Sequence, residues 1–265
     1  MVIVALLLIN VFFIAVIIVD SVADAQSERQ AIENVCSIMR NSGIQINPED
    51  IKTSGALRTM LAVRGDDAEE AIAYALLGPT EMTDQGVIYL YESAERGKAV
   101  FFSAGDFEIS LNKSVVTSGN GALRTVKRLL RDMKLETAEP VISGDIGNET
   151  VSVACVYRGA RIFNCAIEFI FRGENLETIK GRYVTGLEIM EDGHEISSAG
   201  TALLEFLAWV KKEDVVCLRI DNIEAGYQYY VIGSSGESVI TPAWLITADS
   251  GRYIIDDATG EIWAQ

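Results

Sequence analysis

The chain closes with two neighbouring segments, ITPAWLIT over residues 240–247 and GRYIIDDATGE over residues 251–261. Large apolar side chains recur at alternate positions in both segments: Trp244, Ile246, Tyr253 and Ile255. A period of two is typical of β-strands, and pairs of aromatic and β-branched side chains stabilise adjacent antiparallel strands. The pattern predicts a hairpin with one buried face and one solvated face. A turn is expected over residues 256–260, where Gly260 adopts a positive φ easily.

Upstream of this hairpin, runs of short strands follow helices three times. Apolar spacing and capping signals predict four helices, over residues 23–41, 66–77, 120–133 (with Asn120 as the cap) and 198–210. Alternation and turn residues predict strands at 87–91, 99–102, 107–111, 151–157, 161–172, 176–189, 215–223, 227–232, 239–248, 251–256 and 261–263. Adjacent short strands are typical of antiparallel meanders, so the expected fold class is α+β, with helices packed on one face of each sheet.

The predicted organisation has three parts. Residues 1–19 form a transmembrane anchor, residues 20–113 a juxtamembrane helix and first α+β module, and residues 114–265 a second α+β module.

The anchor is predicted from an unbroken apolar run, VIVALLLINVFFIAVIIV, over residues 2–19. At about 1.5 Å per residue it gives roughly 27 Å of helix, enough to cross the hydrocarbon core of a bilayer. The alternative is a cleaved signal peptide, because Ala23-Asp24-Ala25 has the A-x-A spacing of a cleavage site. The run is longer than a usual signal core and no Lys or Arg precedes it, which favours a retained single-pass anchor in the cell membrane with the bulk of the chain extracytoplasmic.

Asn10 is the polar residue in this run. A side-chain amide in the bilayer is costly unless it finds a partner, and a neighbouring transmembrane helix is a natural source of one. Local backbone bonding is the alternative. The predicted contact face of the anchor consists of Leu6, Asn10, Phe13 and Ile17.

Charge restricts the partners of the soluble part. The net charge is −16, which disfavours binding to nucleic acid, since that requires a basic surface. A basic stripe nevertheless runs along the helix that begins near residue 120; its members include Arg124, Arg128 and Arg131. It is either a solvated helix face or a contact for an acidic partner or an anionic wall polymer.

Four cysteines are too few for a disulfide scaffold, but Cys155 and Cys165 flank a turn at residues 158–161. A two-residue loop would pair Cys155 with Asn164 and place the thiols on opposite faces of the sheet. A three-residue loop would put the two thiols opposite each other. The sequence leaves both open.

No catalytic, cofactor or metal site is predicted. His194 is the one histidine, so neither a zinc site nor a serine–histidine–aspartate arrangement is expected, and it is interpreted as a surface turn residue. The acid pairs at residues 66–67 and 256–257 lack the ligand spacing of a calcium loop and are interpreted as solvated turns.

Both ends of the chain resemble the YycI/YycH family of membrane-anchored regulators. The C-terminal motif reads P-A-W-L-I over residues 242–246 and G-R-Y-I-I-D-D-A-T-G-E over residues 251–261, and the N-terminal motif is Ile9-Asn10-Val11-Phe12. The T-G-E ending is also similar to PepSY-type domains. In the family an aromatic residue and asparagine are common where this chain has Ile255-Asp256-Asp257.

The resemblance implies a non-enzymatic regulator without cofactors. Its anchor would contact the transmembrane helices of a WalK-type sensor histidine kinase, a component of a two-component system that controls cell-wall metabolism, with a paralogous regulator as a further partner. The alternative is a PepSY-like binding or inhibitory module for a secreted or wall-associated hydrolase.

Overall fold

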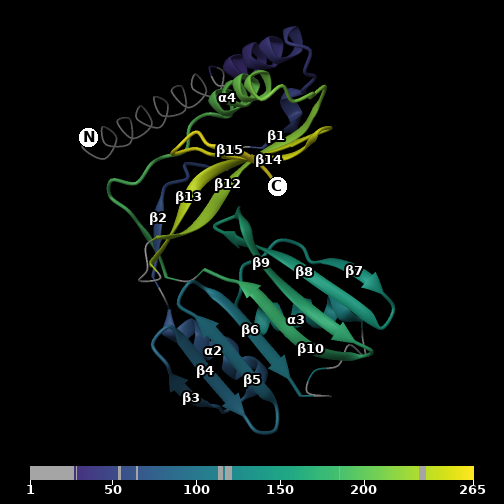
Figure 1. Ribbon diagram of the computed structural model, residues 1–265, viewed down its shortest axis with the longest axis vertical. Helices are drawn as coiled ribbons and strands as arrows, with labels where there is room; N and C mark the ends of the chain where they lie inside the picture. Colours follow the sequence, from purple (N-terminus) through teal and green to yellow (C-terminus); the bar gives the residue numbers. More distant parts are fainter. Residues whose placement is uncertain are drawn as a thin grey trace, which may run out of the picture.

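The computed structural model describes residues 27, 29–52, 55–63, 65–112, 116, 121–184, 186–232 and 237–265. It confirms a mixed α+β architecture, with one hydrogen-bonded network of strands and helices laid beside it (Figure 1). The predicted anchor and its contact face, Leu6, Asn10, Phe13 and Ile17, lie outside the described residues. None of the helices within those ranges is long and apolar enough to cross a membrane.

The lower part of Figure 1 holds a meander of antiparallel strands with two helices behind it. Its elements are α2 (Asp66–Leu77), β3 (Glu81–Asp84), β4 (Ile88–Ser93), β5 (Gly97–Phe102), β6 (Asp106–Leu111), α3 (Ala122–Asp132), β7 (Val141–Asp145), β8 (Asn148–Tyr157), β9 (Ala160–Arg172) and β10 (Asn175–Arg182). Strands run in the order β3-β4-β5-β6-β10-β9-β8-β7, so β3 and β7 are its two edges. Helix α2 packs on β4 and β5, and α3 packs on β8.

The upper part joins the two ends of the described chain. It contains helical residues 29–41, η1 (Pro48–Asp50), β1 (Ile51–Lys52), β2 (Met60–Ala62), β11 (Leu187–Ile189), α4 (Ala199–Lys212), β12 (Ile220–Ile232), β13 (Glu237–Ala248), β14 (Gly251–Asp256) and β15 (Ile262–Ala264). β12 and β13 form the central hairpin. β1 pairs with β12, while β2 and β14 pair with β13.

The predicted C-terminal hairpin is confirmed as β13 and β14, and its predicted inward face is buried. Trp244 is 2% exposed and Ile255 is inaccessible. The expectation of a solvated opposite face is wrong. Leu245 and Ile254 on that face are each 1% exposed, because Phe163 of β9 packs over them and Trp263 of β15 lies against the same cluster.

The strands differ from the expectation in several places: β3 and β7 were not predicted, and the strand predicted from residue 215 begins at Ile220. The predicted strand 176–189 ends at Arg182, and β11 pairs instead with β2. Gly186, with a φ of 59°, redirects the chain so closely past Val63 that a Cβ would lie 2.3 Å from its carbonyl oxygen. The break predicted between strands 215–223 and 227–232 is absent. Residues 220–232, including Gly226, form the continuous strand β12.

The predicted helices are found within the described residues, the first of them over residues 29–41, and one cap differs. α3 begins after Gly121, which is its N-cap, while Asn120 lies outside the described residues. Val126, Leu130 and Met133 are buried as expected, whereas Leu123 is 37% exposed. Ser198 caps α4 by accepting a hydrogen bond from the Thr201 amide at 3.2 Å.

Helical residues 29–41 are part of the upper core. Val35, Cys36 and Met39 are buried, and Val35 lies beside Gly200 of α4. The chain after this helix then joins the sheet, because the Gln45 amide donates to the Leu218 carbonyl at 2.8 Å and the Gln45 carbonyl accepts from the Ile220 amide at 2.8 Å. Helical residues 29–41 and the segment after them are therefore fixed to the C-terminal sheet.

The two parts meet where β9 runs parallel to β12. Gly226 pairs with Arg161 in this short ladder. Asn164 extends the ladder with its side-chain amide: Nδ2 donates to the Tyr229 carbonyl and Oδ1 accepts from the Tyr229 amide, each at 2.8 Å. Where the two parts meet, the Asn164 side chain thus takes the place of a backbone partner for Tyr229.

A shift of register between β8 and β9 decides how Cys155 and Cys165 are placed relative to each other. The β8–β9 loop consists of Arg158 and Gly159, and the register then shifts between Ala154 and Val156, so Cys155 has no partner on β9 and is paired with Thr137 on its other side. Cys155 and Cys165 are both buried and free.

Candidate functional site

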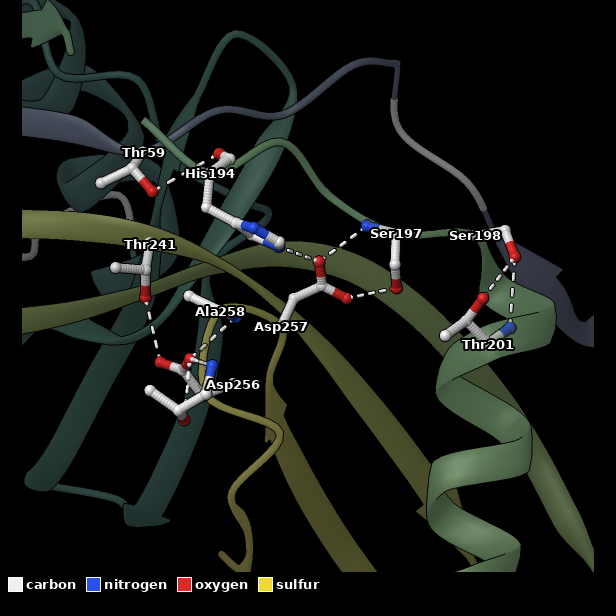
Figure 2. A network of polar contacts seen from close by, with 10 residues as sticks. Thr59, His194, Ser197, Ser198, Thr201, Thr241, Asp256, Asp257 and Ala258 are labelled. Carbon is white, nitrogen blue, oxygen red and sulfur yellow. Dashed lines mark hydrogen bonds and ion pairs between the residues drawn. The ribbon is translucent and has the colours of Figure 1, made fainter. Parts of the chain in front are cut away.

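The C-terminal turn is held by two consecutive buried carboxylates (Figure 2). The turn predicted over residues 256–260 is confirmed, with a φ of 71° at Gly260. The prediction that the acid pair Asp256-Asp257 is solvated is wrong: Asp256 is 3% exposed and the Asp257 side chain is 1% exposed. The physical reason is that each carboxylate accepts several hydrogen bonds that replace water.

Asp256 ends β14 and accepts bonds from both sides of the hairpin. Oδ1 accepts from the amides of Ala258 at 3.0 Å and Thr259 at 2.8 Å, which closes the turn. Oδ2 accepts from the Tyr230 hydroxyl at 2.7 Å and from Thr241 Oγ1 at 3.2 Å. Burial, together with this bond to a carboxylate, raises the pKa of Tyr230, so its phenol stays protonated and donates.

Asp257 connects the turn to the segment before α4. Its Oδ2 accepts from the Ser197 amide at 2.6 Å and from His194 Nε2 at 2.7 Å, while Oδ1 accepts from Ser197 Oγ at 2.5 Å. The ring of His194 is 40% exposed. The same carboxylate, after burial, raises the pKa of Glu205 on α4. We name Asp256, Asp257, His194 and Ser197 the C-terminal clasp.

The clasp has the residue types of a hydrolase triad but a different geometry. In a triad the serine hydroxyl donates to histidine, which in turn is oriented by aspartate. Here Ser197 and His194 both donate to Asp257, so the imidazole does not activate the hydroxyl. The arrangement is suited to fastening three segments together. The third is the segment before β2, because the Thr59 amide donates to the His194 carbonyl at 2.9 Å.

Sequence reasoning placed His194 in a surface turn and missed its partner. The two residues are 63 positions apart, and no local pattern links them. An ion pair next to it, Arg58 with Glu195 at 2.6 Å, fastens the same segments and was also missed.

The basic stripe predicted on α3 is exposed in the structure. Arg124, Arg128 and Arg131 all lie on the solvent side of the helix. An open groove of about 910 Å³ separates α3 from residues 135–140, and Arg124 and Arg131 line it, whereas Arg128 does not.

A smaller cavity of about 40 Å³ lies at the joint between the two parts, beside Tyr229, Tyr183 and Phe107. Such a volume has room for a water molecule but not for an organic ligand. Among the described residues there is no group of three or more His, Cys, Asp or Glu side chains placed to hold a metal ion.

Comparison with known proteins gives a fold rather than a family. No family model matches the chain, and no curated protein matches it. The solved structures that resemble it include an uncharacterized protein from Eubacterium rectale, with a TM-score of 0.50 and 12% identity over 81% of this chain and 89% of that one. They also include the YpeB C-terminal domain of Bacillus megaterium, with a TM-score of 0.37 and 13% identity over 77% of this chain and 98% of that one. The first likeness establishes a shared fold.

Proposed function

We propose that this chain is a non-enzymatic, membrane-anchored, extracytoplasmic regulator of a two-component sensor histidine kinase of the WalK type. The N-terminal apolar run would supply the single-pass anchor, with Leu6, Asn10, Phe13 and Ile17 against the transmembrane helices of the kinase. The resemblance of both chain ends to the YycI/YycH family supports this reading.

One structural observation carries the proposal. The helical residues 29–41, which follow the apolar run, are built into the C-terminal core through Val35, Cys36 and Met39. A change in the position of the C-terminal sheet would therefore move helical residues 29–41, the described helix that follows the predicted anchor in the sequence. Such a link allows an outer event to alter how the anchor packs.

Regulation in this mechanism depends on a difference in the affinity of the anchor for two packings of the kinase helices. The anchor would bind one packing of the kinase helices more tightly than the other, and a ligand or partner of the outer part would change that preference. A regulator that bound both packings equally would shift nothing.

The test is co-purification of the kinase with the full chain from native membranes. Asn10→Leu removes the one amide of the predicted contact face, and a lost interhelical hydrogen bond should reduce the recovered kinase by about threefold or more. Phe12→Leu, on the opposite side of the predicted helix, is the matched control and should leave recovery unchanged. Equal recovery with Asn10→Leu and wild type would reject this face.

A second candidate is a PepSY-like module that binds or inhibits a secreted or wall-associated hydrolase. It is favoured by the T-G-E ending, which belongs to the turn that the buried Asp256 closes. The test uses the full chain in detergent as bait for secreted proteins. Dose-dependent inhibition of a captured hydrolase, with no kinase recovered from membranes, would favour this function over the first.

A further inference from the structure

The arginines of α3 are unusual in a chain with a net charge of −16. Lys127 on the same helix pairs with Glu139 at 2.6 Å, but across the described ranges no ion pair joins Arg124 or Arg131 to a carboxylate. Both are exposed and both line the groove between α3 and residues 135–140. Two guanidinium groups on one wall of a groove attract carboxylate or phosphate groups.

The two acidic residues of the groove do not neutralise these arginines, because both are engaged elsewhere. Glu139 is held by Lys127. Glu136 accepts from the amides of Arg158 at 3.2 Å and Gly159 at 3.1 Å. The wall of the groove that contains Arg124 and Arg131 therefore keeps its positive charge.

The groove also has an apolar lining. Leu123 is 37% exposed within it, and Leu130, Leu135 and Pro140 contribute further apolar surface. Residues 135–140 continue into β7, where Ile142 is 42% exposed on the α3 side of the sheet, beside its partner Val151, and Val141 is 66% exposed on the opposite side, beside its partner Ser152. Apolar and basic surfaces thus lie side by side.

The outer side of this segment offers backbone groups as well. The Ala138 amide donates to the Ala154 carbonyl at 2.9 Å, and the Glu136 carbonyl accepts from the Val156 amide at 3.1 Å. Residues 136 and 138 thus bond inward to β8, and in an antiparallel pair the amide and carbonyl of the residue between them, Thr137, point away from it. β7 continues this edge, and all its residues are exposed at the margin of the sheet (Figure 1).

We propose that the groove between α3 and residues 135–140 binds an extended acidic peptide of a partner protein. Its backbone would lie along the edge from Thr137 to β7, as in strand addition. Its carboxylates would meet Arg124 and Arg131 on the side of α3, and its apolar side chains, which point to the opposite face of the sheet, would contact Val141. The inference does not depend on the kinase proposal, which concerns the anchor.

A peptide fits these surfaces better than an anionic wall polymer. A polymer of phosphate groups would use the arginines but would gain nothing from the exposed apolar side chains or the outward backbone groups. An extended peptide with alternating acidic and apolar residues uses all three features, since its side chains alternate between two faces.

The test is fluorescence anisotropy with the full chain in detergent and a labelled peptide of alternating valine and glutamate. A peptide of alternating valine and glutamine is the neutral probe, and poly(glycerol phosphate) is the competing polyanion. The double variant Arg124→Glu/Arg131→Glu is compared with Arg128→Glu/Arg252→Glu, which changes the net charge equally at exposed positions outside the groove. Val141→Ser probes the apolar contact.

The expected result is that the acidic peptide binds, the neutral peptide binds at least tenfold more weakly, and the groove variant weakens binding at least tenfold. The control variant should weaken it less than threefold, and Val141→Ser should weaken peptide binding without affecting the polyanion. No binding of the acidic peptide, or equal loss in both double variants, overturns the proposal. Tight polyanion binding without peptide binding overturns it in favour of a wall polymer.

Discussion

At the scale of single residues, the fold depends on buried carboxylates that are surrounded by hydrogen-bond donors. Asp256 accepts hydrogen bonds from Tyr230, Thr241 and the turn that follows it. Asp257 fastens the segment before α4 to the same turn. Hydrogen bonds to a charged group are stronger than those between neutral groups. These two residues therefore stabilise the C-terminal turn more than neutral hydrogen-bond acceptors would.

We expect Asp256→Ala to destabilise the protein by about 3 kcal/mol, because the Tyr230 hydroxyl and the turn amides lose their acceptor in a buried site. Thermal unfolding of the full chain should show a fall in the midpoint of roughly 6–12 °C.

The control for that variant is Asp192→Ala, which removes an exposed aspartate from another turn. It should change stability by less than about 0.5 kcal/mol. An Asp256→Ala protein as stable as the Asp192→Ala protein would show that the buried acceptor contributes little.

At the scale of elements, β12 is the strand that joins both parts of the molecule. It pairs with β13 along its length and with β9 at Gly226 and Tyr227. Gly226 permits this approach, since a Cβ there would lie 2.5 Å from the Arg161 carbonyl oxygen and 2.5 Å from the Phe163 ring. A glycine within a strand often marks such close contact.

We expect Gly226→Ala to destabilise the protein by about 3 kcal/mol, because backbone and ring must both move to admit one methyl group. Urea unfolding measured by tryptophan fluorescence gives the change in midpoint. Gly55→Ala is the matched control: no heavy atom lies within 4 Å of its would-be Cβ, so the change should stay within about 1 kcal/mol. Tolerance of alanine at Gly226 would mean that β9 and β12 lie further apart than described.

At the scale of the whole molecule, the described structure brings its two ends together beside the meander formed by the middle, and one buried cluster runs through both parts. Helical residues 29–41 and α4 pack beside the sheet of β12 to β15 (Figure 1). The four cysteines are distributed through both parts and all are buried. Their reactivity therefore reports on the integrity of the whole fold.

We expect the thiols of the native chain to react slowly with a disulfide reagent at pH 8 and quickly in urea. Burial raises the pKa of Cys155 from 9.0 to about 12, so the thiolate that attacks the reagent is scarce in the folded state. Since folding favours the protonated thiol, its contribution to stability is present below pH 9 and declines as the pH rises towards 12.

The measurement is the number of thiols per chain that react with the reagent, followed by stopped flow with and without urea. The native count should be near zero over minutes and should rise to four in urea. Two thiols that stay unreactive even in urea would indicate a bridge between Cys155 and Cys165, contrary to the described structure.

The sequence by itself determined the class of the fold and most of its elements. Period-two alternation located β4, β5, β6 and the C-terminal hairpin, and apolar spacing located α2 and α4, because both patterns are local consequences of backbone geometry. The basic side chains of α3 could be identified in the same way, since spacing along a helix decides which side chains share a face. The anchor rests on the sequence alone.

Only the tertiary structure decided what these elements meet. The second face of the hairpin is buried by Phe163, the acid pair is enclosed, and His194 binds a carboxylate 63 positions away. The groove beside α3 exists because residues 136–138 bond to β8. Each of these features depends on contacts between residues far apart in the chain, and local periodicity carries no information about such pairs.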